Sequence, residues 1–377
     1  MTQKLFGVIL KKLIISWKMV NTEDAMDGQF RGRQARFNYI DVIKGIAILF
    51  VILVHVDQKI KPNSIVISNV SSIGARAPQL FFVISGYLTW RSADNRYNKS
   101  FFIKRAYRII PSYYIALFLS LIFVYFNSTF PTADNIIAHL FLVHGLSPYW
   151  INSIIEVGWF VGDLVIFYML FPLLKKIIKD MKTSLFCFIV CVILSSLVLV
   201  LYRTQWNQDL NKVEIFFTTQ FFIHQLPCFL LGIVIFYLDR YTDEDVIRQR
   251  RVLISYALIL IALLFIFYIF NLNKRILTSS LIAGMISSWI VLFSKSIRNV
   301  FDNKIFTPFV YLGKHSYSIY LFHYLVICWV DKGFSLNNSL FHFLLLFTVS
   351  LSVSLAISVI ISQIEYRMEK KRIRKCN

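Results

Sequence analysis

The sequence carries little charge for its length and lacks the loops by which many soluble nucleotide-binding enzymes are identified. Only 16% of its 377 residues are Asp, Glu, Lys or Arg, whereas 57% are hydrophobic and 16% are aromatic. It contains no P-loop, no Gly-x-Gly-x-x-Gly motif, no internal repeat and no low-complexity tract. A soluble domain of this length could not bury so much apolar surface, so the composition predicts a polytopic membrane protein.

Cysteine is also scarce, and its spacing excludes the common metal and disulfide frameworks. The five cysteines form no Cys-x-x-Cys pair, and four of them lie within apolar stretches. We expect them to act as small apolar fillers, so we expect no metal site and no permanently bound cofactor.

Acidic residues are half as frequent as basic ones, with 20 Asp and Glu against 40 Lys and Arg and a net charge of +20. Such a charge could indicate nucleic-acid binding, but its distribution argues against that partner. Long apolar runs alternate with short basic loops, and 30 of the 40 Lys and Arg residues fall on one side when the loops are assigned alternately. The positive-inside rule makes that side cytoplasmic and places both termini there.

The predicted fold is all-α, with about ten transmembrane helices, each near the ~20 residues that a bilayer requires. A basic cytoplasmic segment (1–37) precedes the membrane domain (38–363), and a basic cytoplasmic tail (364–377) follows it. The predicted spans are 38–56, 74–90, 109–127, 156–173, 183–202, 213–238, 252–271, 276–294, 309–330 and 339–363.

Two apolar segments are not assigned as spans. The stretch TADNIIAHLFLVHGL (132–146) is too short and too interrupted to cross, so we expect 128–155 to be an outer loop with a re-entrant or interfacial helix. The N-terminal MTQKLFGVILKKLIISWK has lysines within its apolar run and no small-residue cleavage site, which argues against a signal peptide. An amphipathic helix on the inner leaflet and a later start at Met19 or Met26 both stay open.

The first predicted span, IDVIKGIAILFVILVHV (40–56), contains three titratable side chains. Lys44 and His55 are eleven residues apart, close to three helical turns, so they share a face and lie ~16 Å apart along the axis. Asp41, one turn before Lys44, is placed to pair with it. An ionisable residue within a membrane indicates a functional site by default. The structural alternative is an ion pair near the interface with His55 as a polar cap.

The stretch FFIKRAYRIIPSYY (101–114) places Arg105 and Arg108 on one helix face at the cytoplasmic entrance of the third span. Two guanidinium groups so spaced suit bidentate phosphate binding. The alternative is the basic flank that most membrane-spanning helices have.

Three further residues are candidate contacts for a substrate. Arg76 lies at the outer edge of the second span, where Ser85-Gly86 predicts a close helix contact. Asp163 lies inside the fourth span and must face a cavity or a cation. His323 lies within the ninth span, where a histidine can equally be hydrogen-bonded between helices.

Six stretches together resemble, in order, the successive signatures of acyltransferase family 3, bacterial inner-membrane O-acyltransferases that modify lipopolysaccharide, other envelope glycans and antibiotics. The resemblance covers residues 38 to 365 approximately. The stretches are YIDVIKGIAILFVILVH, LFFVISGYL, FFIKRAYRIIPSYY, GWFVGDLVIFYMLFPLL, HQLPCFLLGIVIFY and LGKHSYSIYLFH.

The resemblance implies transfer of an acyl group, usually from acetyl-CoA, to a sugar hydroxyl on the far side of the membrane. The family's basic residue and histidine, ten positions between them, fall on Lys44 and His55, and its Arg-x-x-Arg element falls on Arg105 and Arg108. Many members have Glu five residues after the tryptophan of the fourth motif, whereas here Asp163 follows at four. The hydrolase-like C-terminal domain of some relatives is not expected here.

The functional prediction is therefore a membrane-bound O-acyltransferase, with the bilayer and a glycan or lipid-linked saccharide such as O-antigen or exopolysaccharide as its expected partners. His55 and Lys44 are the predicted catalytic residues: His55 is the base, and Lys44 stabilises the charge of the donor or positions its thioester. Arg105 and Arg108 are the predicted ligands of the CoA phosphates. Arg76, Asp163 and His323 are the predicted acceptor contacts. A transporter or flippase of a lipid-linked glycan is the principal alternative, and a scaffold subunit of an envelope complex is another.

Overall fold

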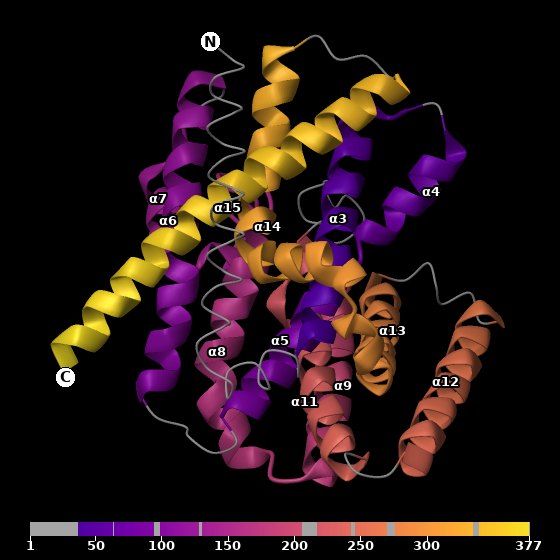
Figure 1. The fold of residues 1–377 in the computed structure, drawn as a ribbon. Helices are drawn as coiled ribbons and strands as arrows, with labels where there is room; N and C mark the ends of the chain where they lie inside the picture. The colour runs from indigo at the N-terminus through magenta and orange to yellow at the C-terminus, as the bar shows by residue number, and fades with distance from the viewer. Residues whose placement is uncertain are drawn as a thin grey trace. The chain divides into compact units, whose positions relative to one another are not determined.

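Helices form all of the regular structure in the described part of the chain, which contains no strand (Figure 1). In the computed structural model, the described residues are 37–62, 64–93, 99–127, 130–205, 217–242, 246–269, 276–334 and 339–376. They divide into two units: Met1–Ala75, Ala106–Ala116 and Ile297–Asn377 make unit 1, and Arg76–Arg105 and Leu117–Ser296 make unit 2. The expectations for the first 36 residues lie outside the described part.

Unit 1 is organised around the helix that carries Lys44 and His55. This helix, α3, packs against α4, α14 and α15. Its apolar side chains Ile48, Ile52 and Val56 are fully buried, as is Ile319 of α14. The helices of unit 1 are α3 (Asn38–Ile60), α4 (Ile65–Gly74), α14 (Thr307–Gly333), α15 (Leu340–Cys376), the short 3-10 helices η3 (Arg298–Asp302) and η4 (Lys304–Phe306), and the middle of α6 (Lys99–Asn127).

Unit 2 is organised around α11, which packs against α5, α8, α9 and α13. An aromatic core lies where these helices meet: the Phe167 ring is 5.2 Å from Phe82 and 5.0 Å from Phe229. The helices of unit 2 are α5 (Ala77–Ser92), α7 (Ala133–Leu140), η1 (His144–Leu146), α8 (Trp159–Ile177), α9 (Met181–Gln205), α11 (Phe222–Thr242), α12 (Val246–Ile269), α13 (Ile276–Ser296) and the two ends of α6.

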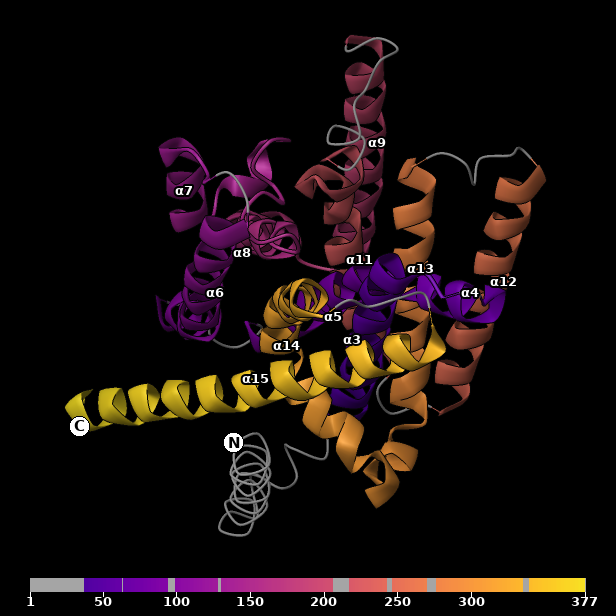
Figure 2. The same cartoon turned by 90° about the horizontal axis from the view of Figure 1, so that it is seen from above.

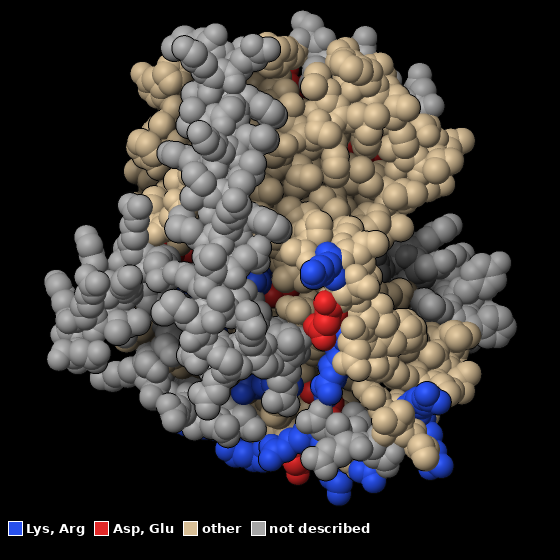
Figure 3. All heavy atoms as spheres, viewed as in Figure 1, with Lys and Arg blue, Asp and Glu red and all other residues tan. Residues whose placement is uncertain are grey.

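Each of the ten predicted spans overlaps one of these helices, and the all-α expectation is confirmed for the described residues. Five helical stretches are long and apolar enough by themselves to cross a membrane: Asn38–Ile60, Phe101–Asn127, Met181–Leu201, Phe217–Tyr241 and Leu340–Glu365. The α9 stretch leaves Phe186, Ile189, Ile193 and Leu197 more than half exposed, which only a lipid environment makes favourable. Most of the described surface drawn in Figure 3 is likewise free of charged side chains. These features are those of a multi-pass membrane protein.

Glycines set the closest helix contacts in each unit. In unit 1, a Cβ atom at Gly45 would collide with the carbonyl oxygen of Phe309, and one at Gly313 with that of Asp41, so α3 and α14 meet backbone to backbone. In unit 2, a Cβ at Gly86 would collide with the carbonyl of Phe229. The predicted close contact at Ser85-Gly86 is therefore confirmed.

Three features differ from the expected boundaries. Helix α4 occupies the loop predicted after the first span, and it begins where the Ser64 side chain accepts a hydrogen bond from the Ile67 amide at 3.4 Å. Helix α6 begins at Lys99, ten residues before the predicted span. Helix α15 continues without interruption to Cys376 (Figure 2), because the basic sequence after 363 is rich in helix-forming residues and has no Gly or Pro to end it.

Candidate active site

A buried ion pair lies near the start of α3. Lys44 Nζ is 2.6 Å from the carboxylate of Asp41, one turn earlier, as the spacing predicts. The Lys44 side chain is almost fully buried, so this pairing offsets part of the cost of keeping the charge away from water.

Two further basic residues of unit 1 act on Lys44. Arg108 of α6 and Lys314 of α14 both exert a repulsive Coulomb interaction on its ammonium group. Lys314 reaches this position because the preceding residue, Gly313, rests on the backbone of Asp41. The role of Lys314 as a third basic residue beside Lys44 and Arg108 was not evident from sequence, where it reads as an ordinary basic flank.

We define the basic cluster as Lys44, Arg108 and Lys314. A carboxylate of the last helix interacts with this cluster. Glu365 of α15 interacts electrostatically with Arg108 and accepts a hydrogen bond from Ser112 Oγ at 3.0 Å. With Asp41 and Glu365 set against three cations, the cluster keeps a net positive charge. Such a group of cations suits an anionic ligand that carries several phosphates.

An imidazole pair, His55 and His323, lies at the other end of α3. The ring centroids are 5.2 Å apart, and the edge of Tyr324 meets the His55 ring at 5.0 Å. His323 is completely buried, whereas His55 is partly accessible. His323 and Lys314 both belong to α14, so Lys44 and His55 of α3 face the same neighbouring helix.

The surroundings of the two rings define their tautomers. His55 Nδ1 is 2.8 Å from Gln58 Oε1, and His323 Nδ1 is 2.6 Å from the carbonyl oxygen of Tyr320. The Tyr320 carbonyl can only accept, so His323 Nδ1 carries the hydrogen and its Nε2 has a lone pair. With the Gln58 amide oriented so that its oxygen faces His55, that ring has the same tautomer. A neutral imidazole with an unprotonated Nε2 is a general base. Sequence reasoning placed His55 here but missed Gln58, whose i, i+3 spacing on α3 was the available signal.

Arg105, in unit 2, has aromatic and hydroxyl partners. Its guanidinium group lies 3.5 Å from the Phe101 ring centroid and 5.3 Å from that of Tyr168. It also donates a hydrogen bond to Ser92 Oγ at 2.8 Å. Arg108 belongs to unit 1, so the structure describes the two arginines of α6 in separate surroundings and does not show them as a joint phosphate clamp.

Asp163 is fully buried on α8 in unit 2, and neither carboxylate oxygen has a hydrogen-bond partner among the described residues. Gly145 lies beside it, since a Cβ there would be 3.7 Å from Asp163 Oδ1. A buried ionised carboxylate without a donor is very costly, so this side chain is stable only when neutral or when a ligand provides a donor. Arg76, which was also predicted to contact the acceptor, is exposed at the start of α5.

A second pair of histidines, not predicted as a site, lies in the segment of unit 2 that contains α7 and η1. The rings of His139 and His144 stack with centroids 4.3 Å apart, and both are fully buried. His144 Nε2 is 3.0 Å from the Gly158 carbonyl oxygen, to which it donates. Burial lowers the pKa of His144 to about 4, and burial together with the neighbouring His144 lowers that of His139 to about 3. Both histidines belong to the 132–146 stretch, for which the sequence predicted a helix but no site.

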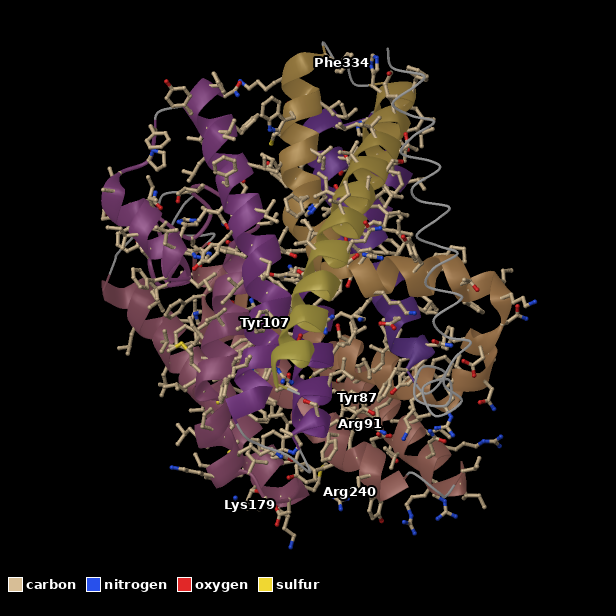
Figure 4. All side chains as sticks on the ribbon, turned by 60° about the vertical axis from the view of Figure 1, so that its left-hand side comes forward. Tyr87, Arg91, Tyr107, Lys179, Arg240 and Phe334 are labelled. Atoms are coloured by element: carbon tan, nitrogen blue, oxygen red, sulfur yellow. The ribbon has the colours of Figure 1, made fainter. Side chains whose placement is uncertain are left out.

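A charged network joins three helices of unit 2. Asp239 of α11 is paired with Lys295 of α13 and, at 3.3 Å, with Arg91 of α5. The Tyr87 hydroxyl donates to the same carboxylate at 2.8 Å. Figure 4 shows Tyr87 and Arg91 close together on α5. The charged and hydroxyl groups of this network are hydrogen-bonded to one another, so the network connects α5, α11 and α13.

The described residues contain no group of three or more His, Cys, Asp or Glu arranged to hold a metal ion. Cys187, Cys191, Cys228 and Cys328 are free thiols.

Comparison with known proteins agrees with this chemistry. Two Staphylococcus aureus proteins, "Putative O-acetyltransferase SACOL0978" of strain COL and "Putative O-acetyltransferase MW0856" of strain MW2, are each 25% identical over 337 residues, covering 78% of this chain and 51% of the relative. The "Exopolysaccharide production protein ExoZ" of Rhizobium meliloti strain 1021 is 31% identical over 109 residues, covering 26% of this chain and 34% of the relative.

The chain thus spans about half the length of the Staphylococcus relatives that it matches. No solved structure matches it significantly. The family model for the acyltransferase domain of acyltransferase family 3 matches residues 37–363, which is most of the chain. The protein therefore belongs to acyltransferase family 3.

Proposed function

We propose that the protein is an O-acetyltransferase that moves the acetyl group of acetyl-CoA to a sugar hydroxyl of a cell-envelope glycan, such as O-antigen or exopolysaccharide. The names of the relatives support both parts, since they refer to O-acetyl transfer and to exopolysaccharide production. In this proposal the chain crosses the bacterial inner membrane ten times, with both termini in the cytoplasm and the acceptor on the outer side. The distribution of Lys and Arg supports that orientation.

The observation that carries the proposal is the pair of polar sites on α3. The basic cluster lies near its start and the imidazole pair near its end, ~16 Å away at the rise of an α-helix. A donor with several phosphates suits the first site, and a hydroxyl acceptor suits the second. Their separation along one helix fits a reaction whose two substrates approach from opposite sides of a membrane.

The proposed reaction proceeds as follows. Nε2 of His55 accepts the proton of the acceptor hydroxyl as its oxygen attacks the carbonyl carbon of the thioester. The carbon–sulfur bond then breaks, the thiolate of CoA leaves, and an ester remains on the sugar. The hydrogen bond from His55 Nδ1 to Gln58 holds the ring in the required tautomer throughout.

The basic cluster takes the donor's phosphates in this proposal. Lys44, Arg108 and Lys314 provide the charge, and the buried position of Lys44 strengthens its interaction with an anion. Arg105, in unit 2, keeps its predicted role as a ligand of a CoA phosphate, and its guanidinium group stacks on the rings of Phe101 and Tyr168. Arg76 and Asp163 stay predicted acceptor contacts, on the grounds of their positions in the sequence.

The experiment that tests the proposal compares the envelope polysaccharide of cells with and without the gene by mass spectrometry. We expect a mass difference of one acetyl group per modified sugar, present only with the gene. Purified protein in lipid nanodiscs should also consume [14C]acetyl-CoA when a glycan acceptor is added. Identical glycan masses together with no consumption of acetyl-CoA would exclude this activity.

A transporter of lipid-linked glycan keeps one observation in its favour, the buried Asp163 without a described partner, since buried acids of that kind occur along transport pathways. It predicts no binding of acetyl-CoA by the purified protein, which isothermal titration would show directly.

A further inference from the structure

Each ring of the imidazole pair offers an acceptor, and no donor, beyond its contacts with its own helix. In both His55 and His323, the Nδ1 hydrogen is already directed at an acceptor of the ring's own helix. Each ring therefore has only the lone pair of Nε2 left to interact with a substrate.

His323 Nε2 has an additional property. It is buried, and no donor among the described residues reaches it. A buried acceptor without a donor is unfavourable, and such atoms are rare in folded proteins. The imidazole cannot relieve this cost by exchanging tautomers, because Nδ1 would then place a lone pair against the carbonyl oxygens of Tyr320 and Ile319.

Two charged groups of α3 near the pair are engaged elsewhere. The ammonium group of Lys59 lies 3.7 Å from Asp331 Oδ2 and 5.9 Å from the centroid of the Tyr324 ring. Asp57 accepts a hydrogen bond from Ser68 of α4. Neither interaction involves an imidazole nitrogen.

A ligand that satisfies two adjacent acceptors must bring two adjacent donors. The proposed reaction uses one hydroxyl, whose proton goes to His55. We propose that His323 Nε2 accepts a hydrogen bond from a second, neighbouring hydroxyl, so that the acceptor substrate is a polyol with vicinal hydroxyl groups and His323 is a positioning residue for it. This inference rests on the proposed O-acyl transfer.

The physical consequence concerns specificity. An acceptor that lacks the second hydroxyl leaves His323 Nε2 unsatisfied in a closed site, and a site built around a buried polar group rejects the analogue that cannot pair with it. The second hydroxyl also fixes the rotation of the acceptor, which orients the reacting oxygen toward His55. Loss of His323 should therefore remove a preference between acceptors and not only reduce the rate.

The test uses purified protein in nanodiscs, [14C]acetyl-CoA and two small alcohols of similar size, propane-1,2-diol and propan-1-ol. We expect the wild-type protein to prefer the diol by at least about tenfold in kcat/KM. His323→Phe, which keeps a flat ring against His55 but has no lone pair, should use both alcohols at similar efficiency, because the diol's KM rises. His323→Gln, whose amide oxygen is an acceptor, should recover part of the preference.

His315→Phe is the matched control, since it removes a histidine from the same helix whose Nδ1 contacts Ser358 and not the imidazole pair. It should retain the wild-type preference for the diol. As a readout without turnover, the 15N resonance of His323 Nε2 should move on addition of the diol and not of propan-1-ol.

Two results would overturn the inference: a wild-type protein with no preference for the diol, or a His323→Phe variant that loses efficiency toward both alcohols in equal proportion. A wild-type protein that transfers acetyl to neither alcohol nor to any glycan fails at the earlier step, and that result counts against the proposed function itself.

Discussion

The imidazole rings of His55 and His323 lie 5.2 Å apart, on the neighbouring helices α3 and α14. They come from positions 268 residues apart in the chain, and the contact exists because Gly45 and Gly313 let the two helices approach backbone to backbone. The same contact brings Lys314 to Lys44 at the opposite end of α3. One helix packing therefore builds both halves of the candidate active site.

Replacing His55 with alanine should lower acetyl transfer by about 10²–10⁴-fold, the usual contribution of a general base. The measurement is the initial rate of [14C]acetyl transfer at saturating acetyl-CoA. His342→Ala, a histidine of α15, is the control for the loss of an imidazole. Full activity in well-folded His55→Ala protein would remove this residue from its assigned role.

Replacing Lys314 with alanine should raise the KM for acetyl-CoA severalfold with little change in kcat, because a cation that contributes to binding alone acts equally on ground state and transition state. The effect should diminish as salt is added, since screening weakens the interaction with phosphates. Lys332→Ala, at the other end of α14, serves as the control. An unchanged KM at low salt would exclude Lys314 from the donor site.

Replacing Gly313 with alanine should destabilise unit 1 by about 1–3 kcal/mol, the usual cost of overpacking, because the added methyl group collides with the Asp41 carbonyl and separates α14 from α3. Thermal unfolding in detergent measures the effect as a lower Tm. The matched control is Gly333→Ala near the end of the same helix, where a Cβ meets no atom within 4 Å. Equal Tm values for the two variants would contradict this packing.

The stacked pair His139 and His144 should make stability depend on pH. Both have a pKa below the usual 6.5, at about 3 and about 4, because burial disfavours the charged ring. The unfolded chain therefore binds more protons, and their contribution, fully present above pH 6.5, is lost as the pH falls toward 4. In that range, each histidine lowers the free energy of unfolding by about 1.4 kcal/mol for every pH unit that the pH falls.

The measurement for this pair is the free energy of unfolding in detergent between pH 7 and pH 4, for the wild type and for His139→Phe/His144→Phe. The double variant keeps two stacked rings that cannot titrate, so its free energy of unfolding should decline less with falling pH than that of the wild type. Parallel curves for the two proteins would show that the pair does not titrate as its burial requires.

Much of the architecture was predictable because it depends on local patterns. Long apolar runs require a membrane and helices to satisfy the backbone within it, and each predicted span does overlap a helix. The i, i+3 spacing of Asp41 and Lys44 predicted their ion pair for the same reason, since helix geometry alone brings them together. Ends of helices were less predictable: α4 depends on a single serine cap, and α15 continues because nothing in its basic sequence stops it.

Contacts between distant segments needed the tertiary structure. The sequence by itself determined an all-α membrane protein of acyltransferase family 3, with Lys44 and His55 on one face of a helix. Only the packing of α14 on α3 decided that Lys314 joins Lys44, and that His323 meets His55 with its Nδ1 held by its own helix. The physical reason is that helix periodicity orders side chains along one axis, whereas the neighbour they face depends on which glycine-lined surfaces interlock.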